Sequence, residues 1–359
     1  MSYRFPITEM SSHNHLNRGI LDNTLKPLVF LVDFSDEDHE YTEEQFQNLL
    51  FAEDLSPTRA NFPSDHDDYT MSVRDYYDEI SNGKQKIKGD IESIVPWKTA
   101  THEYSYYVDG ENGTGTGPNG NARSAAALVV EIAMEIDEEG FDFTQFDNGE
   151  GFIDVVILIV SGKGGQQSTG NHFWPHMFIV PTSDPNSEFG LENINPNAPV
   201  SNSGYFSPGG INIYKYIVIQ ERYAWNHPGT GIDMLHPIGT ICHELGHVLG
   251  LPDLYDNITP AAGIGYWGLM GAGNYLRQTS PAYMSAWSRY RLGFIVPDTL
   301  SDIYALEITI PPAERLDVGA AYILPMSSNL PQEYLMIENR QKEGSDKHLT
   351  KSGLLVWHI

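Results

Sequence analysis

The sequence predicts an α+β fold, in which a mixed β-sheet with flanking helices precedes a smaller β-rich segment. Two observations lead to this prediction. Up to Pro297, short apolar runs rich in β-branched residues alternate with stretches whose apolar residues recur at helical spacing. Beyond Pro297, the chain shows only short strand-like runs. The chain has 359 residues, 40% of them hydrophobic, which is enough to bury a substantial core.

Four strands are expected in the first part of the chain besides the one predicted at the end of residues 72–97. Residues 26–34 (KPLVFLVDF), 151–160 (GFIDVVILIV) and 211–220 (INIYKYIVIQ) are short and rich in Val, Ile, Leu and Phe. Such runs are typical of buried strands, because β-branched side chains fit a pleated sheet better than a helix. Residues 104–108 (YSYYV) are interpreted as a further strand, polar and aromatic in character.

Three helices are expected between these strands. Thr42 and Gln45 have the spacing of a capping box and stand ahead of a short amphipathic stretch. Residues 72–97 predict a capped helix that ends at Gly83 and is followed by a strand. Residues 122–137 are rich in Ala and place apolar residues at helical spacing, which favours a helix.

The predicted organisation has three parts: a leader or pro-segment remnant at 1–26, a catalytic domain at 27–297 and a β-rich segment at 298–359. Between 164 and 210 lies a Gly-, Pro-, Asn- and Ser-rich loop, of a length that is usually functional or ion-bound. Four strand-like runs make up the last part: 303–310, 320–326, 333–339 and 353–359. The last run has no closing turn and the N-terminus lacks a signal-peptide pattern, so flanking segments, including a secretion signal, are expected to be missing.

The charge balance excludes several classes of partner. There are 48 acidic and 21 basic residues, so the formal net charge is −27, which repels phosphate backbones and anionic membrane surfaces. We therefore expect no nucleic-acid partner. The sequence contains no stretch of 18 apolar residues, so no membrane span is expected. The acidic excess suits a saline environment or calcium binding, for which Asp33, Asp36 and Asp38 are candidates; a solvated loop end is the alternative. The single cysteine, Cys242, allows no internal disulfide.

The most informative stretch is HELGHVLGLPD at residues 243–253. His243 and His247 are four residues apart, so on a helix they face the same way and can both reach one zinc ion at about 2.0–2.1 Å. Glu244 follows the first histidine, where it can take a proton from metal-bound water without ligating the metal. The pattern predicts two metal ligands and a catalytic base.

A third ligand is expected just beyond the helix. Gly250 can adopt the left-handed conformation that ends a helix and reverses the chain, which would bring Asp253 back to the ion. The full pattern, H-E-x-x-H-x-x-G-x-x-D, differs from the metzincin form by Asp in place of the last His. Met270, between glycines in GYWGLMGAGNY, is expected to form the Met-turn beneath the site without bonding to the metal.

Three alternatives accompany this prediction. The two histidines could belong to an ordinary buried helix, or zinc could be retained in a secreted binding or surface module without proteolytic activity. A gluzincin peptidase would take its third ligand from a glutamate on a later helix instead of Asp253. The intact Glu244 favours catalysis: a zinc-dependent endopeptidase that hydrolyses protein or peptide substrates by metal-activated water, with a glutamate general base.

At this point the chain resembles the immune inhibitor A family of bacterial secreted metallopeptidases. The matching stretches are HELGHVLGLPDLYD (243–256), LVDFSD (31–36), SVRDYYDEISNGKQKIKGDI (72–91), IDVVILIVSGKG through FWPH (153–176) and EYLMIENRQ through GLLVWHI (333–359). The resemblance implies a metzincin-like zinc peptidase domain with a mixed sheet, active-site helix and Met-turn. It also implies a secreted precursor with a pro-segment and later β-sandwich domains. This chain departs from the family in its nearly absent pro-segment and its larger acidic excess.

Three other features are candidates of lower rank. Residues 115–120 (GTGPNG) match G-x-G-x-x-G, but the loop is too long for a tight phosphate turn, so a surface loop is the better interpretation. His172 and His176 are four apart, but Pro175 breaks a helix between them, so they are expected to be structural or to line the substrate cleft. Tyr275 could donate to an oxyanion, but it lies farther from Met270 than in metzincins that use such a tyrosine.

Overall fold

The computed structural model describes most of the chain. It covers residues 23–54, 71–117, 119, 122–164, 171–181, 204–224, 233–256, 263–300, 307–315, 321–326 and 333–359. Residues 1–22 of the predicted leader and the larger part of the predicted loop at 164–210 lie outside the described residues.

A six-stranded sheet forms the centre of the molecule, in the order β11-β10-β6-β2-β4, with β7 also paired to β10. Its strands are β2 (Leu28–Asp33), β4 (Ile94–Thr99), β6 (Val156–Lys163), β7 (His176–Ile179), β10 (Lys215–Ala224) and β11 (Asp233–Leu235). The strands β4, β2, β6 and β10 are parallel, whereas β7 and β11 run antiparallel to β10. Because β6 pairs along one edge of β10, both β7 and β11 pair along its other edge.

The central strands follow the predicted runs, with two interruptions. The run at 151–160 is divided into β5 (Phe152–Ile153) and β6 near Asp154, whose side chain accepts the backbone N–H of Lys26. The run at 211–220 is divided into β9 (Asn212–Ile213) and β10. The short strands β5 and β9 form a three-stranded sheet with β8 (Tyr205–Phe206).

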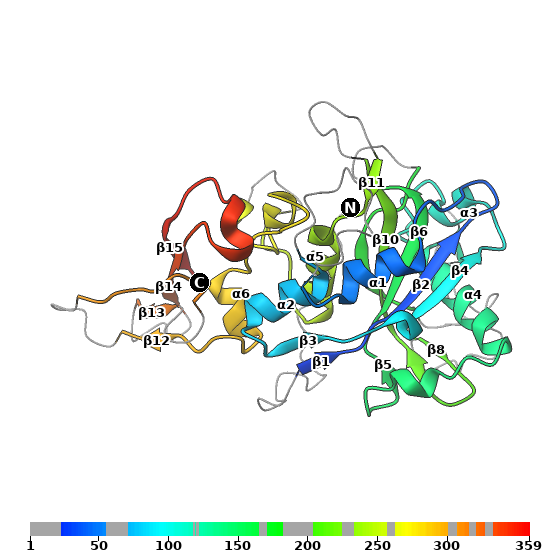
Figure 1. The fold of residues 1–359 in the computed structure, drawn as a ribbon, viewed down its shortest axis with the longest axis horizontal. Helices are drawn as coiled ribbons and strands as arrows, with labels where there is room; N and C mark the ends of the chain where they lie inside the picture. The colour runs from blue at the N-terminus through cyan, green and yellow to red at the C-terminus, as the bar shows by residue number, and fades with distance from the viewer. Residues whose placement is uncertain are drawn as a thin grey trace.

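Three helices cover one face of the central sheet: α1 (Glu43–Phe51), α2 (Val73–Ser81) and α5 (Ile238–Val248) (Figure 1). Thr42 and Ser72 each begin a helix with a complete capping box, as the sequence predicted for Thr42. α2 ends at Asn82, which is left-handed (φ 54°), one residue before the predicted Gly83. β3 (Gln85–Ile87) follows it and pairs with β1 (Asn23–Leu25).

The other face of the sheet is covered by α3 (Tyr104–Val108) and α4 (Ala125–Glu138). The strand predicted at 104–108 is wrong, because this stretch is helical. Its buried residues are Tyr104, Tyr107 and Val108, which have the i, i+3, i+4 spacing of a helix face. Asp36 accepts the N–H of Tyr104 at 2.9 Å and so fixes the start of the helix.

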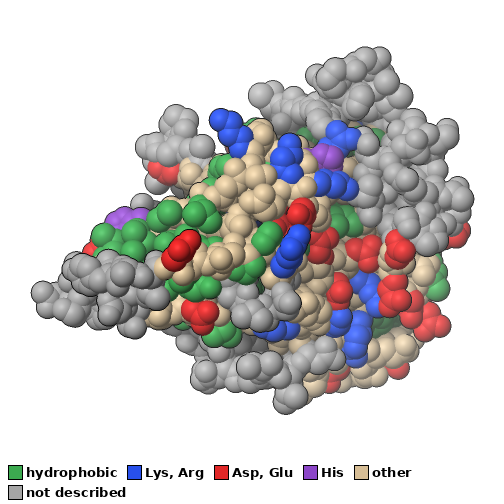
Figure 2. Space-filling model, turned by 60° about the vertical axis from the view of Figure 1, so that its left-hand side comes forward, with side chains coloured by type: hydrophobic (Ala, Val, Ile, Leu, Met, Phe, Trp, Pro, Cys, Tyr) green, Lys and Arg blue, Asp and Glu red, His purple; other side chains and the backbone are tan. Residues whose placement is uncertain are grey.

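A four-stranded sheet lies at the end of the molecule opposite α4 (Figure 1). It consists of β12 (Asp298–Thr299), β13 (Tyr322–Pro325), β14 (Tyr334–Arg340) and β15 (Gly353–His358), and α6 (Ala286–Arg291) packs against β14. Short 3-10 helices are η3 (Ile91–Ser93), η5 (Phe143–Phe146), η8 (Gly265–Trp267), η9 (Ala272–Tyr275) and η10 (Gly344–His348). One face of this sheet is exposed, with Leu354 at 62% and Val356 at 57%, and Figure 2 shows hydrophobic side chains gathered on this end of the surface.

The architecture, with several sheets and few helices among the described residues, confirms the prediction of a mixed α and β protein. Within the described part of the chain, no helix is both long enough and apolar enough to cross a membrane.

Candidate metal centre

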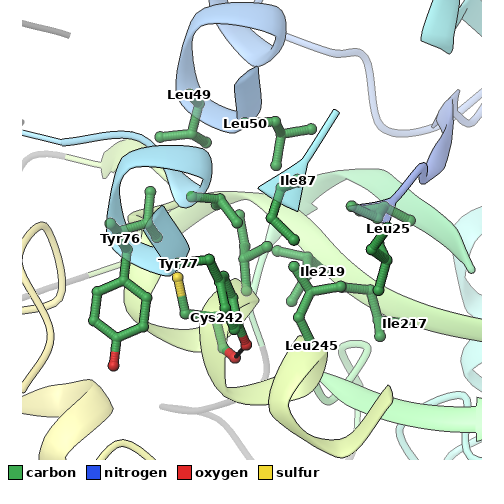
Figure 3. Close-up of a cluster of buried hydrophobic side chains, with 14 of the residues drawn as sticks. Leu25, Leu49, Leu50, Tyr76, Tyr77, Ile87, Ile217, Ile219, Cys242 and Leu245 are labelled. Atoms are coloured by element: carbon green, nitrogen blue, oxygen red, sulfur yellow. Dashed lines mark hydrogen bonds between the residues drawn. The ribbon is translucent and has the colours of Figure 1, made fainter. Parts of the chain in front are cut away.

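The helix α5 carries both histidines and is held against the central sheet by its apolar side. Ile241, Cys242 and Leu245 are at most 1% exposed. Figure 3 shows Cys242 and Leu245 beside Tyr77 of α2 and the β10 strand. The Tyr77 hydroxyl donates to the Cys242 carbonyl at 2.7 Å, at the residue before His243. The helix is therefore fixed in rotation, with its other side turned toward Leu251, Asp253 and Leu269.

The end of α5 returns the chain toward the histidines. Gly250 has φ of 98°, a conformation that L side chains rarely adopt. Its N–H donates to the His247 carbonyl at 2.9 Å, and the Leu251 N–H donates to the Gly246 carbonyl at 3.0 Å. These two bonds define a Schellman motif. Asp253 is thereby placed next to the face of the helix that carries the histidines.

The structure brings His243, His247 and Asp253 together. One ligand atom from each lies within 4.8 Å of the other two. Asp253 Oδ1 is 3.1 Å from His243 Nε2 and 3.3 Å from His247 Nε2. Among the described residues, this is the one group of three or more His, Cys, Asp or Glu side chains arranged to hold a metal ion.

Backbone carbonyls set the orientation of both imidazoles. His243 Nδ1 donates to the Leu269 carbonyl at 2.9 Å, and His247 Nδ1 donates to the Leu251 carbonyl at 2.8 Å. With the proton on Nδ1, each Nε2 presents a lone pair to the same carboxylate oxygen. Three electron-rich atoms then converge on one point, which is favourable only around a positive charge. The donor set of two imidazoles and one carboxylate fits a divalent zinc ion.

The electrostatics of the metal-free residues agree with this arrangement. Burial alone would lower the pKa of His247, but its hydrogen bond to Asp253 and the charge of Glu244 raise that pKa to about 9. Burial would raise the pKa of Asp253, but hydrogen bonds from His243 and His247 outweigh it and hold the pKa well below its ordinary value. Both shifts favour positive charge on the histidine side and negative charge on the carboxylate, so the cluster as a whole favours a cation between these groups.

Glu244 lies beside this cluster and is 6% exposed. Burial raises its pKa above the ordinary value, whereas the neighbouring His243 and His247 and a hydrogen bond from the Met177 backbone lower it by less. Met177 belongs to β7, the antiparallel strand along the edge of β10. The carboxylate is thus partly desolvated and is held by one backbone donor, which suits a group that must gain and lose a proton.

Met270 packs beneath the helix, where the sequence predicted a methionine floor. A Cβ atom on Gly246 would lie 2.5 Å from Met270 Sδ, so only glycine leaves room for this side chain. The Met270 carbonyl accepts the N–H of Leu254 at 2.8 Å, which ties the segment after Asp253 to the same turn. The helix α5, the segment that carries Asp253 and the turn at Met270 are therefore packed and hydrogen-bonded to one another.

Two tyrosines border the cluster, and neither was among the predicted site residues. The Tyr255 ring stacks on His243 with centroids 6.4 Å apart, and its hydroxyl is hydrogen-bonded to Asp253. For Tyr275, burial is the main cause that raises the pKa to about 12, with contributions from Tyr223 and Glu244. Tyr255 lies two residues after Asp253, and this proximity was the one signal in the sequence that could have identified it.

The loop at 115–120 and His176, two further candidates of lower rank, do not belong to the ligand cluster. Residues 115–120 follow a helix instead of a strand, and Asp109 accepts the Asn119 N–H at 2.9 Å, so the described part of this loop has no dinucleotide-binding arrangement. His176 is in β7, with Nε2 3.1 Å from the Tyr216 hydroxyl, and burial lowers its pKa to about 4. Both ring nitrogens thus have partners within the fold, which supports the structural interpretation.

The proposed calcium ligands are directed to protein partners. Asp33 Oδ2 lies 2.7 Å from His39 Nδ1, and Asp36 accepts the N–H of Tyr104. Within the described residues these carboxylates do not form a three-member ligand group. Calcium binding at Asp33, Asp36 and Asp38 stays a prediction.

Comparison with known proteins yields matches that cover most of the chain. The model of the family described as "Immune inhibitor A peptidase M6, catalytic domain" matches residues 21–296. The pre-pro-metalloprotease PrtV of Vibrio cholerae serotype O1 is 25% identical over 304 residues, which is 74% of this chain and 29% of PrtV. Immune inhibitor A of Bacillus thuringiensis subsp. alesti is 24% identical over 280 residues, 70% of this chain and 36% of that protein. The chain thus spans about a third of the length of these relatives.

Proposed function

Because the chain belongs to the immune inhibitor A peptidase M6 family, we propose that it is a zinc-dependent endopeptidase whose metal is held by His243, His247 and Asp253. Both the family and the enzyme class, a metalloendopeptidase, agree with the prediction from sequence, and the match to the family confirms them. The observation that supports the specific site is the convergence of two Nε2 atoms and one carboxylate oxygen at 3.1 and 3.3 Å.

A set of three protein ligands is typical of a catalytic zinc site, whereas a structural site has four. A catalytic zinc has three protein ligands and an open position, and when bound it lowers the pKa of water to about 7 and polarises the substrate carbonyl. His243 and His247 would hold the ion through their Nε2 atoms, because the Leu269 and Leu251 carbonyls hold the Nδ1 protons. Asp253 would supply a negative charge that offsets part of the charge of the ion.

Glu244 is the proposed general base. Its raised pKa brings the carboxylate closer to the pH at which it can both accept and return a proton. It takes a proton from the attacking water and then delivers that proton to the nitrogen of the leaving amine. The hydrogen bond from the Met177 N–H holds one side of the carboxylate in place during both transfers.

The substrate is proposed to be an extended segment of a protein or peptide. β7 lies at the edge of the sheet and is joined to the site through Met177, so a peptide that pairs with this strand would pass in front of Glu244. We further propose that 27–297 is the catalytic domain, with a metzincin-like Met-turn at Met270, and that the enzyme acts outside the cell.

Replacement of Glu244 by Gln tests the proposal. The variant keeps the shape of the side chain but cannot accept a proton, so we expect turnover of casein to fall about 10²–10⁴-fold while zinc content stays near that of the wild type. A matched control is Glu221→Gln, since Glu221 is also a buried glutamate with a pKa raised by burial but contacts Glu40 and Tyr41 instead of the site. Unchanged turnover in E244Q would refute the role of Glu244 as general base. No turnover in a zinc-loaded wild type would refute the proposed activity and favour a zinc-containing binding module.

A further inference from the structure

A buried ion pair joins β14 to the segment that carries the metal-site floor. Arg340 and Asp346 are both 0% exposed. The guanidinium of Arg340 donates to Asp346 through Nε and Nη2, the latter at 2.6 Å. Asp346 Oδ1 also accepts the backbone N–H of Tyr283 at 2.9 Å. The pair is therefore bonded to a backbone segment that lies outside the four-stranded sheet.

The same guanidinium holds two carbonyls that flank Met270 in sequence. Arg340 Nη1 donates to the Trp267 carbonyl at 2.6 Å, and Nη2 donates to the Tyr283 carbonyl at 3.4 Å. The Tyr283 carbonyl is shared, because it also accepts the N–H of Leu269 at 3.2 Å. Both bonds fix the turn that contains Leu269.

Leu269 is the residue that orients the first histidine. Its carbonyl accepts the proton of His243 Nδ1 at 2.9 Å. A displacement of the turn would therefore rotate the imidazole or release its Nδ1 proton. A continuous series of hydrogen bonds links Arg340 to His243, through the Tyr283 carbonyl and the backbone of Leu269.

Arginine is well suited to this position. Its planar guanidinium offers five N–H donors in a fixed geometry, so it can bind a carboxylate and two carbonyls at once. Lysine keeps the charge but has a single nitrogen that cannot span these three acceptors. A buried ion pair usually stabilises a fold no more than apolar side chains of similar volume would. The presence of the Arg340–Asp346 pair is therefore better explained by a role other than stability.

We propose that Arg340 is a positioning residue of the metal centre, acting through Leu269 to fix the orientation of His243. The residue lies beyond the part of the chain matched by the family's catalytic domain, which ends at 296. The β-rich segment would then be part of the catalytic architecture. This inference rests on the proposed function of His243 as a metal ligand.

The test compares Arg340→Lys with Arg289→Lys in the full chain. Arg289 is also 0% exposed and donates to a buried glutamate, Glu338, at 2.9 Å; this carboxylate is shared, because it also lies 3.6 Å from Arg340 Nη1. The second hydrogen bond of Arg289 goes to the Ala313 carbonyl instead of the turn. The measurements are the dissociation constant for Zn²⁺ by competition with a chelator, thermal unfolding of the metal-free protein, and kcat and KM on a peptide substrate.

For R340K we expect Zn²⁺ to bind about 10-fold more weakly and kcat to fall with little change in KM, in the range seen when outer partners of metal ligands are replaced. For R289K we expect a similar loss of thermal stability with the Zn²⁺ affinity retained. Equal Zn²⁺ affinity in R340K and the wild type, or equal weakening in both variants, overturns the inference.

A second variant covers the case in which R340K does not fold. Asp346→Asn leaves the arginine in place but removes the charge that orients it, and it should also weaken Zn²⁺ binding; wild-type affinity in D346N would overturn the inference. A wild type that binds no Zn²⁺ would instead refute the proposed function and is distinguishable from either result.

Discussion

Replacement of Asp253 by Asn is the most direct perturbation of the proposed metal site. The asparagine keeps the size of the side chain and one oxygen near the position of Oδ1, which is 3.1 and 3.3 Å from the two Nε2 atoms. It removes the negative charge. Structural zinc sites with four ligands bind with about 10–16 kcal/mol, or about 2.5–4 kcal/mol per ligand. Because a neutral oxygen remains, we expect a loss of about 3 kcal/mol, or roughly 100-fold in the dissociation constant of zinc.

The same substitution should change the stability of the metal-free protein in a pH-dependent way. The pKa of His247 is raised to about 9 from an ordinary 6.5, which corresponds to roughly 3 kcal/mol, and screening of side chains that are 21% and 26% exposed reduces this to about 2 kcal/mol. A raised folded-state pKa gives stability that is complete below pH 6.5 and is lost as pH rises through about 9. The D253N substitution should therefore cost about 2 kcal/mol at pH 6 and little at pH 10.

Two assays check these magnitudes. Competition with a chelator gives the affinity for zinc, and urea unfolding of the metal-free protein at pH 6 and pH 10 gives the stability. Asp256→Asn is the matched control, since it makes the same substitution three residues later on an exposed side chain of the same loop. Zinc binding in D253N within threefold of the wild type would show that another residue is the third ligand. That result would favour the gluzincin alternative, with a glutamate from a later helix.

Three more predictions concern the surroundings of the site. Gly246→Ala places a Cβ atom 2.5 Å from Met270 Sδ. The crowding should cost about 1–3 kcal/mol, which outweighs the gain of about 1 kcal/mol in helix propensity. Both kcat and the urea midpoint of unfolding should fall, and an unchanged kcat would contradict this. Ser72→Ala removes the N-cap of α2 and should lower the free energy of unfolding by about 1–2 kcal/mol, without changing zinc affinity. Burial lowers the pKa of His236 to about 3 and that of His176 to about 4, so below pH 6.5 the unfolded chain binds more protons than the folded chain. As pH drops, each histidine should therefore lower the free energy of unfolding by up to about 1.4 kcal/mol per pH unit. The His236→Gln variant should unfold in acid at a lower pH than the wild type, and an unshifted midpoint would refute this.

The parts of the site predicted from sequence are those that depend on local geometry. The spacing of His243 and His247 is fixed by the helical repeat, and the turn at Gly250 follows from a conformation that few other residues adopt. Both are properties of neighbouring residues, so one sequence was enough to predict them. The buried strands β2 and β6 were predicted for the same reason, since their composition reflects burial on both faces.

The parts that were not predicted depend on contacts between distant segments. The Leu269 carbonyl that orients His243 is 26 residues away from it in sequence. The Met177 N–H that is hydrogen-bonded to Glu244 belongs to the strand β7. No residue type is required at a position that contributes only its backbone, so the sequence carries no signal for either contact. The helix at 104–108 differs from the predicted strand for another reason: its aromatic content favours a strand, and only the spacing of its buried side chains is typical of a helix.

The two glycines of the central motif show how local and distant requirements meet in one pattern. At Gly250 a Cβ atom would meet no heavy atom within 4 Å, so its φ of 98° is the reason for glycine there. Gly246 is in regular helix, and its reason is the Met270 sulfur that occupies the space of a side chain. One glycine therefore brings Asp253 to the histidines, while the other lets the helix lie close on the turn whose Leu269 carbonyl orients His243. Because the two requirements are independent, a chain could keep the first and lose the second. It would then retain three ligands in sequence but lack the close packing that orients the first of them.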